Sequence, residues 1–408
     1  MLVEVEGSQA VADVIVGAAP DVVCAYPITP QTHIVEGVGR AVRSGALHAE
    51  FINVESEFAA LSVLIGASAA GARTYTATAS QGLLFMMEAV YNAGGLGLPI
   101  VMTLANRAVG APINIWNDQS DAMAARDAGW IQLFAESNQD AVDLHIQAFR
   151  IAEQCSLPVM VCMDGFVLTH AVERIDLPAR EEVAAFLPRI PPRQLLAAAD
   201  PITIGAMVGP EAFTEVRVQA HEAMRSACTT IETVQSEFRT AFGRNAGGLL
   251  APYHLDDAET VVVGMGSVLG TMKDVVDRRR ERGERIGVLG VTTFRPFPAE
   301  AIRDALSGRT HVIVLERALA TGTGGILTND IARALFDEDV HLATVVLGLG
   351  GRPVREDDLD SIFVKLRYGT LPDLSFLDLH AEHAGGGRGQ LEMPVHRFGS
   401  PLSRRMTR

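Results

Sequence analysis

Short apolar runs alternate with amphipathic segments along the first half of the chain. The runs predict strands at 22–29, 74–80, 98–106, 129–135 and 157–165, and the amphipathic segments predict helices at 55–71, 82–95 and 139–155. Apolar strands joined by helices are typical of a parallel sheet that is covered on both faces. Ligands of such sheets gather beyond the carboxyl ends of the strands, so that edge is where we expect function.

A second pattern of the same kind begins near residue 260. It predicts strands at 260–267, 285–293 and 311–318, with helices at 268–283 and 298–307. A chain of 408 residues exceeds the roughly 250 to 300 at which a single core stops growing. The sequence therefore predicts a doubly wound parallel-sheet α/β domain over 1–241, a Gly- and Pro-rich linker over 242–259, a smaller α/β domain over 260–378, and an extended or disordered tail over 379–408.

The charge balance excludes two classes of partner. The formal net charge is -15, whereas nucleic-acid grooves and anionic membrane surfaces are bound by clustered Lys and Arg.

The chain has no run of about 18 apolar residues, and its first residues, MLVEVEGSQ, lack the basic start of a signal peptide. We therefore expect a cytoplasmic protein.

The cysteines and histidines show no spacing typical of a metal site. The four cysteines are scattered without a C-x-x-C pair, which fits reduced thiols in the cytoplasm and no iron–sulfur or zinc site on this chain. Four of the histidines lack metal-ligand spacing, and no metal is assigned to them: His33, His48, His145 and His170.

The stretch AYPITPQTHIVEG holds a threonine between two prolines at the end of an apolar run. Pro27 and Pro30 restrict the backbone on either side of Thr29, so its hydroxyl is expected at the carboxyl end of a strand. On local grounds alone, an ordinary turn is the favoured explanation of the same prolines.

Two charged residues are candidates for binding a ligand. Glu57 lies in the first turn of a predicted helix, where it either complements the helix dipole or shares a proton with a ligand nitrogen. Arg107 directly follows the strand at 98–106, and its fixed donors suit the capture of a carboxylate. The alternative for Arg107 is a surface ion pair with an acid such as Asp118. The long loop after it is itself typical of a functional segment.

The turn GMGSVLG, Gly264 to Gly270, resembles a dinucleotide-binding turn. Its spacing is G-x-G-x-x-x-G, and the next predicted strand ends without the acidic residue that would hold a ribose. We therefore favour glycines that pack a strand against a helix.

Several motifs in order resemble the alpha subunit of pyruvate:ferredoxin oxidoreductases. They are YPITPQT (26–32), ESEFAA (55–60), TATASQGLLFM (76–86), NRAVGAPINIWNDQSD (106–121), DGFVLTH (164–170), MGSVLGT (265–271) and FRPFPAEAIRDAL (294–306). The resemblance covers nearly everything before the tail. It implies a pyrimidine-type thiamine-pyrophosphate-binding domain followed by a domain like the C-terminal domain of transketolase.

The family decarboxylates a 2-oxoacid on thiamine pyrophosphate, passes electrons through iron–sulfur clusters to ferredoxin and transfers the acyl group to coenzyme A. This chain lacks a G-D-G segment followed by a metal-binding Asn, and it lacks a cysteine set for a cluster. The resemblance therefore implies that a beta subunit supplies the magnesium-diphosphate site, that the 4Fe–4S clusters lie on partner chains, and that gamma and delta subunits complete the assembly.

The resemblance also implies roles for individual residues. Glu57 would hydrogen-bond N1′ of the aminopyrimidine and favour the imino tautomer whose N4′ removes the proton from C2 of the thiazolium. Thr29 and Arg107 would hold the keto group and carboxylate of pyruvate. The further residues that it places around the cofactor are Pro27, Ile28, Gln81 and Gly82, with Asn117 and Asp118 in a loop of the same cavity.

Three alternatives stay open on the sequence. Thr29 and Arg107 would recognise what all 2-oxoacids share, so 2-oxoisovalerate or 2-oxoglutarate could replace pyruvate. A non-catalytic scaffold or nucleotide-binding subunit would use the second domain instead. A transketolase-like enzyme would use thiamine pyrophosphate without ferredoxin.

Overall fold

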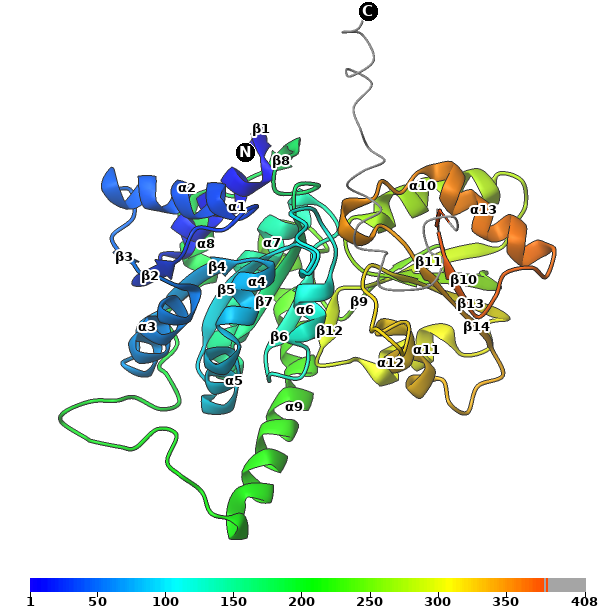
Figure 1. The fold of residues 1–408 in the computed structure, drawn as a ribbon. Coiled ribbons are helices and arrows are strands. Elements are labelled where there is room, and N and C mark those ends of the chain that lie inside the picture. The colour runs from blue at the N-terminus through cyan, green and yellow to red at the C-terminus, as the bar shows by residue number, and fades with distance from the viewer. Residues whose placement is uncertain (378, 381–408) are drawn as a thin grey trace, which may run out of the picture.

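The fold is built on two sheets that lie side by side (Figure 1). A computed structural model describes residues 1–377, 379 and 380. The prediction of an extended tail over 379–408 lies almost entirely outside the described residues.

The first sheet has the strand order β12-β6-β7-β5-β4-β2-β3, and all of its pairs except β12 with β6 are parallel. Its parallel strands are β2 (Val22–Ala25), β3 (Glu50–Asn53), β4 (Thr74–Thr78), β5 (Ile100–Asn106), β6 (Ile131–Phe134) and β7 (Val159–Asp164). Every residue of the four strands β4 to β7 is buried, and β5 and β7 are accordingly almost wholly apolar up to their last residue.

Helices cover both faces of this sheet. One face carries α1 (Gly7–Ala18), α2 (Thr32–Arg43), α7 (Asn138–Cys155) and α8 (Arg180–Phe186), and the other carries α3 (Glu57–Ala69), α4 (Ser80–Phe85), α5 (Met87–Leu96) and α6 (Ser120–Ala124). The Ser137 and Asp140 side chains form a capping box that fixes the start of α7. An antiparallel ribbon of β1 (Leu2–Glu6) and β8 (Val172–Asp176) lies beside α1.

The second sheet has the order β15-β14-β13-β10-β11-β9. Its strands are β9 (Leu250–Tyr253), β10 (Thr260–Gly264), β11 (Ile286–Val291), β13 (His311–Glu316), β14 (His341–Val346) and β15 (Leu374–Phe376). Helices α10 (Val268–Arg280) and α13 (Glu356–Arg367) pack on one face, and α11 (Ala299–Leu306) and α12 (Leu327–Ala334) pack on the other.

Three of the differences between predicted and observed elements have a clear physical reason. The strand predicted at 22–29 ends at Ala25, because Pro27 and Pro30 cannot continue the ladder. The helix predicted at 82–95 is two helices that meet at Met86. The segment 242–259, predicted as a linker, contains β9, which is the outermost strand of the second sheet. Its Pro252 argued against a strand in the sequence, because proline is found in sheets mainly at such outermost strands.

The two units share a strand pairing and a hydrophobic cluster. Strand β12 (Thr293–Arg295) comes from the second half of the chain but pairs with β6 at the edge of the first sheet. One hydrophobic cluster contains Met160 of the first sheet together with Val263 and Leu289 of the second. The long helix α9 (Pro210–Phe242) lies between the two halves of the chain.

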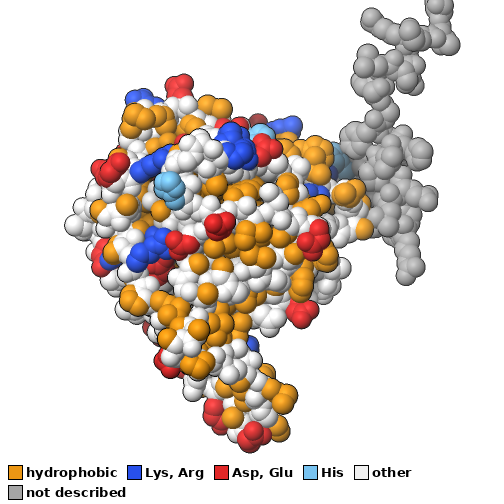
Figure 2. All heavy atoms as spheres, turned by 90° about the vertical axis from the view of Figure 1, so that its left-hand side faces the viewer, with side chains coloured by type: hydrophobic (Ala, Val, Ile, Leu, Met, Phe, Trp, Pro, Cys, Tyr) orange, Lys and Arg blue, Asp and Glu red, His pale blue; other side chains and the backbone are white. Residues whose placement is uncertain are grey.

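Helix α9 is buried only in its second half. There Ala227, Ile231, Val234 and Phe238 join the core, whereas the first half projects from the body (Figures 1 and 2). Among the residues that the structure describes, no helix is long and apolar enough to cross a membrane.

Candidate active site

The candidate residues meet at the carboxyl edge of the first sheet. Thr29 follows β2, Glu57 follows β3, Gln81 follows β4 and Arg107 follows β5. The chain passes from β2 to β3 on one side and from β4 to β5 on the other, so the strand order reverses between β2 and β4. Crevices at such reversals are the usual ligand sites of doubly wound sheets.

Glu57 is the first residue of α3, and its carboxylate is buried. The Ser56 hydroxyl accepts a hydrogen bond from Ala59 N and fixes the start of the helix. Glu57 is 7% exposed and has no hydrogen bond or ion pair among the described residues. A largely buried residue whose carboxylate has no protein partner can accept a hydrogen bond from a ligand N–H group.

Gly82 leaves open the space next to this carboxylate. A Cβ atom on Gly82 would lie 2.6 Å from Glu57 Oε1 and 2.6 Å from Thr78 Oγ1. Thr78 Oγ1 is buried and has no hydrogen-bond partner within the described part of the chain. The two unpaired oxygens beside a glycine fit the polar ring of an aminopyrimidine, so the residues present suit thiamine pyrophosphate.

Gln81 and the loop after β2 form the rim of this crevice. The Gln81 side chain packs against Gly110 of the long loop, since a Cβ there would lie 2.7 Å from Gln81 Nε2. Gln31 Nε2 donates to Tyr26 O at 2.8 Å and closes the turn that holds Pro27 and Ile28. Both loops are thereby held close to the carboxyl ends of the strands.

Arg107 is buried and makes no ion pair with Asp118. Its Nε donates to Asn114 O at 3.0 Å and its Nη1 donates to Thr29 O at 3.0 Å. Burial lowers the pKa of the Arg107 guanidinium. Both side-chain partners are uncharged carbonyl oxygens, and the nearby Asp121 carboxylate opposes the effect of burial on this pKa. Thr29 is exposed, and its backbone rather than its hydroxyl contacts Arg107.

The loop that holds Asn117 and Asp118 connects the two units. Asp118 Oδ1 accepts from Ser120 N at 2.9 Å, and Asp118 Oδ2 accepts from Gly350 N at 3.2 Å. Asn117 O accepts from Gly351 N at 2.6 Å, while the buried Asn117 amide has no partner among the described residues. Asp118 therefore fixes the loop by hydrogen bonds and does not pair with Arg107.

Asp121 was not singled out from the sequence, although it ends the NDQSD motif. Its buried carboxylate accepts from Asn106 Nδ2, Ala122 N, Ser80 N and Arg107 N at 2.8 to 3.0 Å. Burial raises the pKa of Asp121 to about 7, against the opposing effect of these donors. Asp121 thus joins the ends of β4 and β5, from which Gln81 and Arg107 project.

A buried ion pair joins the two units behind this edge. Asp164, the last residue of β7, accepts from Arg317 Nη1 at 2.7 Å and from Ser267 N at 2.8 Å. A Cβ on Gly266 would lie 2.9 Å from Asp164 Oδ2. The glycine turn at 264–270 therefore packs against the first sheet, in line with a structural role.

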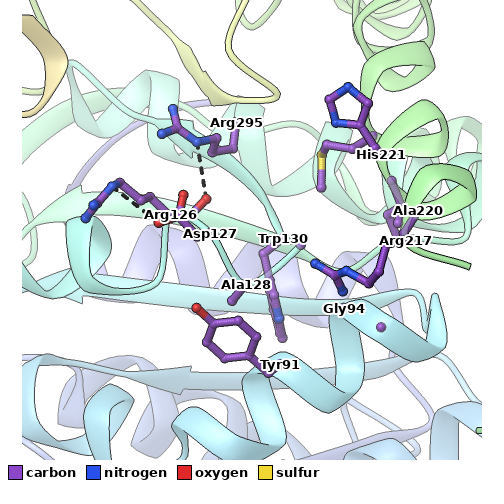
Figure 3. A pocket seen from close by; sticks show the side chains of 14 residues that line it. Tyr91, Gly94, Arg126, Asp127, Ala128, Trp130, Arg217, Ala220, His221 and Arg295 are labelled. Carbon is purple, nitrogen blue, oxygen red and sulfur yellow. Dashed lines mark hydrogen bonds and ion pairs between the residues drawn. The ribbon is translucent and has the colours of Figure 1, made fainter. Parts of the chain in front are cut away.

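One cavity of about 180 Å³ lies away from the candidate residues. It is found between α5, α9 and the amino ends of β6 and β7, at the opposite edge of the sheet (Figure 3). Arg217 and His221 face it from α9, and Trp130 donates from its Nε1 to Val90 O in its wall. None of the residues predicted to bind cofactor or substrate lines this cavity.

Two family models match the chain. The model described as "Pyruvate flavodoxin/ferredoxin oxidoreductase, thiamine diP-bdg" matches residues 13–236, and "Pyruvate:ferredoxin oxidoreductase core domain II" matches residues 258–359. The chain belongs to this family of thiamine-diphosphate-binding oxidoreductases.

Curated relatives are similar over most of the chain. A "Pyruvate synthase subunit PorA" of Methanosarcina barkeri is 46% identical over 93% of this chain and 97% of its own, and that of Thermotoga maritima is 44% identical over 90% and 95%. A "Ketoisovalerate oxidoreductase subunit VorA" of Pyrococcus abyssi is 38% identical over 88% and 91%.

A solved 2-oxoglutarate:ferredoxin oxidoreductase from Magnetococcus marinus shares the fold. The TM-score is 0.66 at 18% identity, over 89% of this chain and 65% of that one. The family, the α/β fold class and the assignment to an enzyme family are thereby confirmed. The roles of individual residues stay predictions.

Proposed function

We propose that this chain is the alpha subunit of a pyruvate:ferredoxin oxidoreductase. With partner subunits it converts pyruvate and coenzyme A reversibly to acetyl-CoA and CO₂ and transfers electrons to ferredoxin. The curated relatives named pyruvate synthase are 41–46% identical to the chain, compared with 38% for the ketoisovalerate relative, which supports pyruvate as substrate.

The observation that carries the proposal is the buried, unpaired carboxylate of Glu57 beside Gly82. Glu57 accepts a hydrogen bond from N1′ of the aminopyrimidine and so controls where the ring holds its protons. Thiamine pyrophosphate supplies the carbon chemistry once it is bound. Gly82, Gln81, Pro27 and Ile28 shape the space around the ring.

Arg107 and Thr29 orient the 2-oxoacid. The buried guanidinium of Arg107 is fixed by two carbonyl oxygens, which leaves its Nη2 without a hydrogen bond among the described residues and able to bind the substrate carboxylate. The exposed Thr29 hydroxyl is available to the keto oxygen. Fixed positions of this kind lower the entropic part of the barrier.

The remaining parts come from partner chains in this proposal. The four cysteines in the described part of the chain are free, and two of them are buried in the core. A beta subunit then supplies the magnesium-diphosphate site, the 4Fe–4S clusters lie on partner chains, and gamma and delta subunits complete the complex. Free thiols are also typical of the cytoplasm, where we place the complex.

The test is an anaerobic assay of the complex purified through this chain. Pyruvate-dependent viologen reduction is followed with and without coenzyme A, for wild type, Glu57→Gln and the control Glu55→Gln, whose residue is exposed and lies two positions earlier. We expect a coenzyme-A-dependent rate that falls at least about 100-fold in Glu57→Gln only.

Other outcomes separate the alternatives. A rate with 2-oxoisovalerate that exceeds the pyruvate rate would move the substrate to that of the ketoisovalerate relative. A complex without thiamine pyrophosphate and without iron–sulfur absorbance would contradict the proposal.

A further inference from the structure

Two histidines and a glutamate that are far apart in the sequence meet on the surface of the first unit. Glu6, His33 and His170 each place one possible metal-ligand atom within 4.8 Å of the other two. The spacing of these residues along the chain, 27 and 137 positions, gives no sign of a metal site. We propose that Glu6, His33 and His170 bind a divalent transition-metal ion.

Backbone pairing fixes Glu6 beside His170. Glu6 ends β1 and pairs with Val172 of β8, Gly7 N donates to Ala171 O at 3.0 Å, and Ser8 N donates to Thr169 O at 3.0 Å. The two ligand-bearing segments are therefore held together by a ladder that does not depend on the side chains.

Close packing of two helices brings His33 to the same place. His33 lies in the first turn of α2, and Gly37 of this helix packs so tightly on α1 that a Cβ there would lie 2.7 Å from Ala12 Cβ. His33 Nδ1 lies 2.7 Å from Glu6 Oε1, and the His33 and His170 rings are 4.8 Å apart between centroids.

The surroundings of His170 suit a metal ligand. Its Nδ1 lies 2.7 Å from Thr169 Oγ1, which can accept the N–H and leave Nε2 free for a metal. The Phe166 ring packs against His170 at 4.7 Å between centroids and limits its rotation. Metal-ligating histidines commonly use their second nitrogen in this way.

The ligand set selects the class of ion. Two imidazoles and one carboxylate suit zinc and similar transition metals, whereas magnesium and calcium prefer oxygen alone. Bonds of about 2.0 to 2.2 Å place ligands roughly 3.4 Å apart, so movements of about 1 Å would close the site. Side-chain rotation supplies this, since His33 and Glu6 are 51% and 30% exposed.

The test uses the full chain, stripped of metal with a chelator and titrated with Zn²⁺ against a chromophoric chelator. We expect one Zn²⁺ per chain, with affinity at least about tenfold lower in His33→Ala and in His170→Ala. His48→Ala, which removes an exposed histidine outside the cluster, should bind like wild type. Co²⁺ should give visible absorption bands in wild type that both cluster variants lose.

Thermal unfolding in chelator checks that the variants fold. We expect equal melting temperatures without metal, and a rise on addition of Zn²⁺ in wild type and His48→Ala only. Equal Zn²⁺ affinity for wild type and the double variant of His33 and His170 would overturn the proposal. The same would follow if wild type gave no Co²⁺ bands.

Discussion

Asp164 at the end of β7 and Arg317 at the end of β13 form an ion pair of 2.7 Å that is buried between the two sheets. The side chains are 1% and 6% exposed, and Ser267 adds a hydrogen bond to the same carboxylate oxygen. The pair therefore links the first sheet to the second at the same strand ends as the candidate active site, since Asp164 is paired with Asn106.

Loss of Arg317 should destabilise the chain strongly. Arg317→Leu leaves Asp164 charged and unpaired in a buried position, which costs about 3 to 5 kcal/mol. Thermal or urea unfolding of the full chain measures this loss. The control Arg225→Ala removes an exposed pair with Glu222 on α9 and should change stability by no more than about 1 kcal/mol. Equal effects of the two substitutions would contradict the structural role of the buried pair.

Gly82→Ala should block the cofactor crevice. The added Cβ would meet Glu57 Oε1 and Thr78 Oγ1 at 2.6 Å, so the carboxylate or the backbone must move. We expect thiamine pyrophosphate affinity and activity of the complex to fall at least about tenfold. The control is Gly66→Ala in the same helix as Glu57, where a Cβ meets nothing within 4 Å. Unchanged cofactor affinity in Gly82→Ala would show that the ring binds elsewhere.

Arg107→Lys should weaken substrate binding while it keeps the positive charge. A lysine cannot reach Asn114 O and Thr29 O together and also present two donors to a carboxylate. We expect the KM for pyruvate to rise at least about tenfold, with thiamine pyrophosphate affinity unchanged. Arg126→Lys, at a site 38% exposed, serves as control. Steady-state kinetics of the complex decide, and an unaltered KM would exclude Arg107 from substrate binding.

Asp121 should make stability depend on pH. Burial raises its pKa in the fold to about 7, compared with about 4 in an unfolded chain. Between these two pKa values the folded chain holds the Asp121 proton more tightly than the unfolded chain does. The stability that this proton contributes is therefore fully present below about pH 4 and is lost as the pH rises through 7. The loss amounts to at most about 4 kcal/mol.

Thermal unfolding from pH 5 to 8 tests this sign. As the pH rises, the melting temperature of wild type should fall relative to that of Asp121→Asn. The expected result is this change with pH, and it does not depend on how far the two melting temperatures differ at pH 5. Asp127→Asn, at a side chain 66% exposed, should run parallel to wild type. Parallel curves for wild type and Asp121→Asn would mean that Asp121 titrates alike in the folded and unfolded chain.

The sequence predicted which residues lie at the carboxyl ends of the strands, but it did not predict the hydrogen bonds that these residues make. Apolar runs marked the strands, and four candidate residues do follow the ends of β2, β3, β4 and β5. Periodicity could not show that Asp118 would bond Gly350, since these residues are 232 positions apart. Asp121 was missed for a related reason: all four of its donors are backbone or amide N–H groups, and three of them, on Ser80, Asn106 and Arg107, are brought close only by the fold.

Strand β12 has a consequence for any attempt to divide the chain. A fragment that stops before Thr293 would lose the partner of β6 and leave the edge of the first sheet unpaired. Such an open edge is a template for aggregation. A fragment that begins at Thr260 would carry β12 without β6, and β11 would lack its neighbour β9. Expression of either half alone should therefore yield insoluble protein, whereas two fragments produced together could restore both sheets.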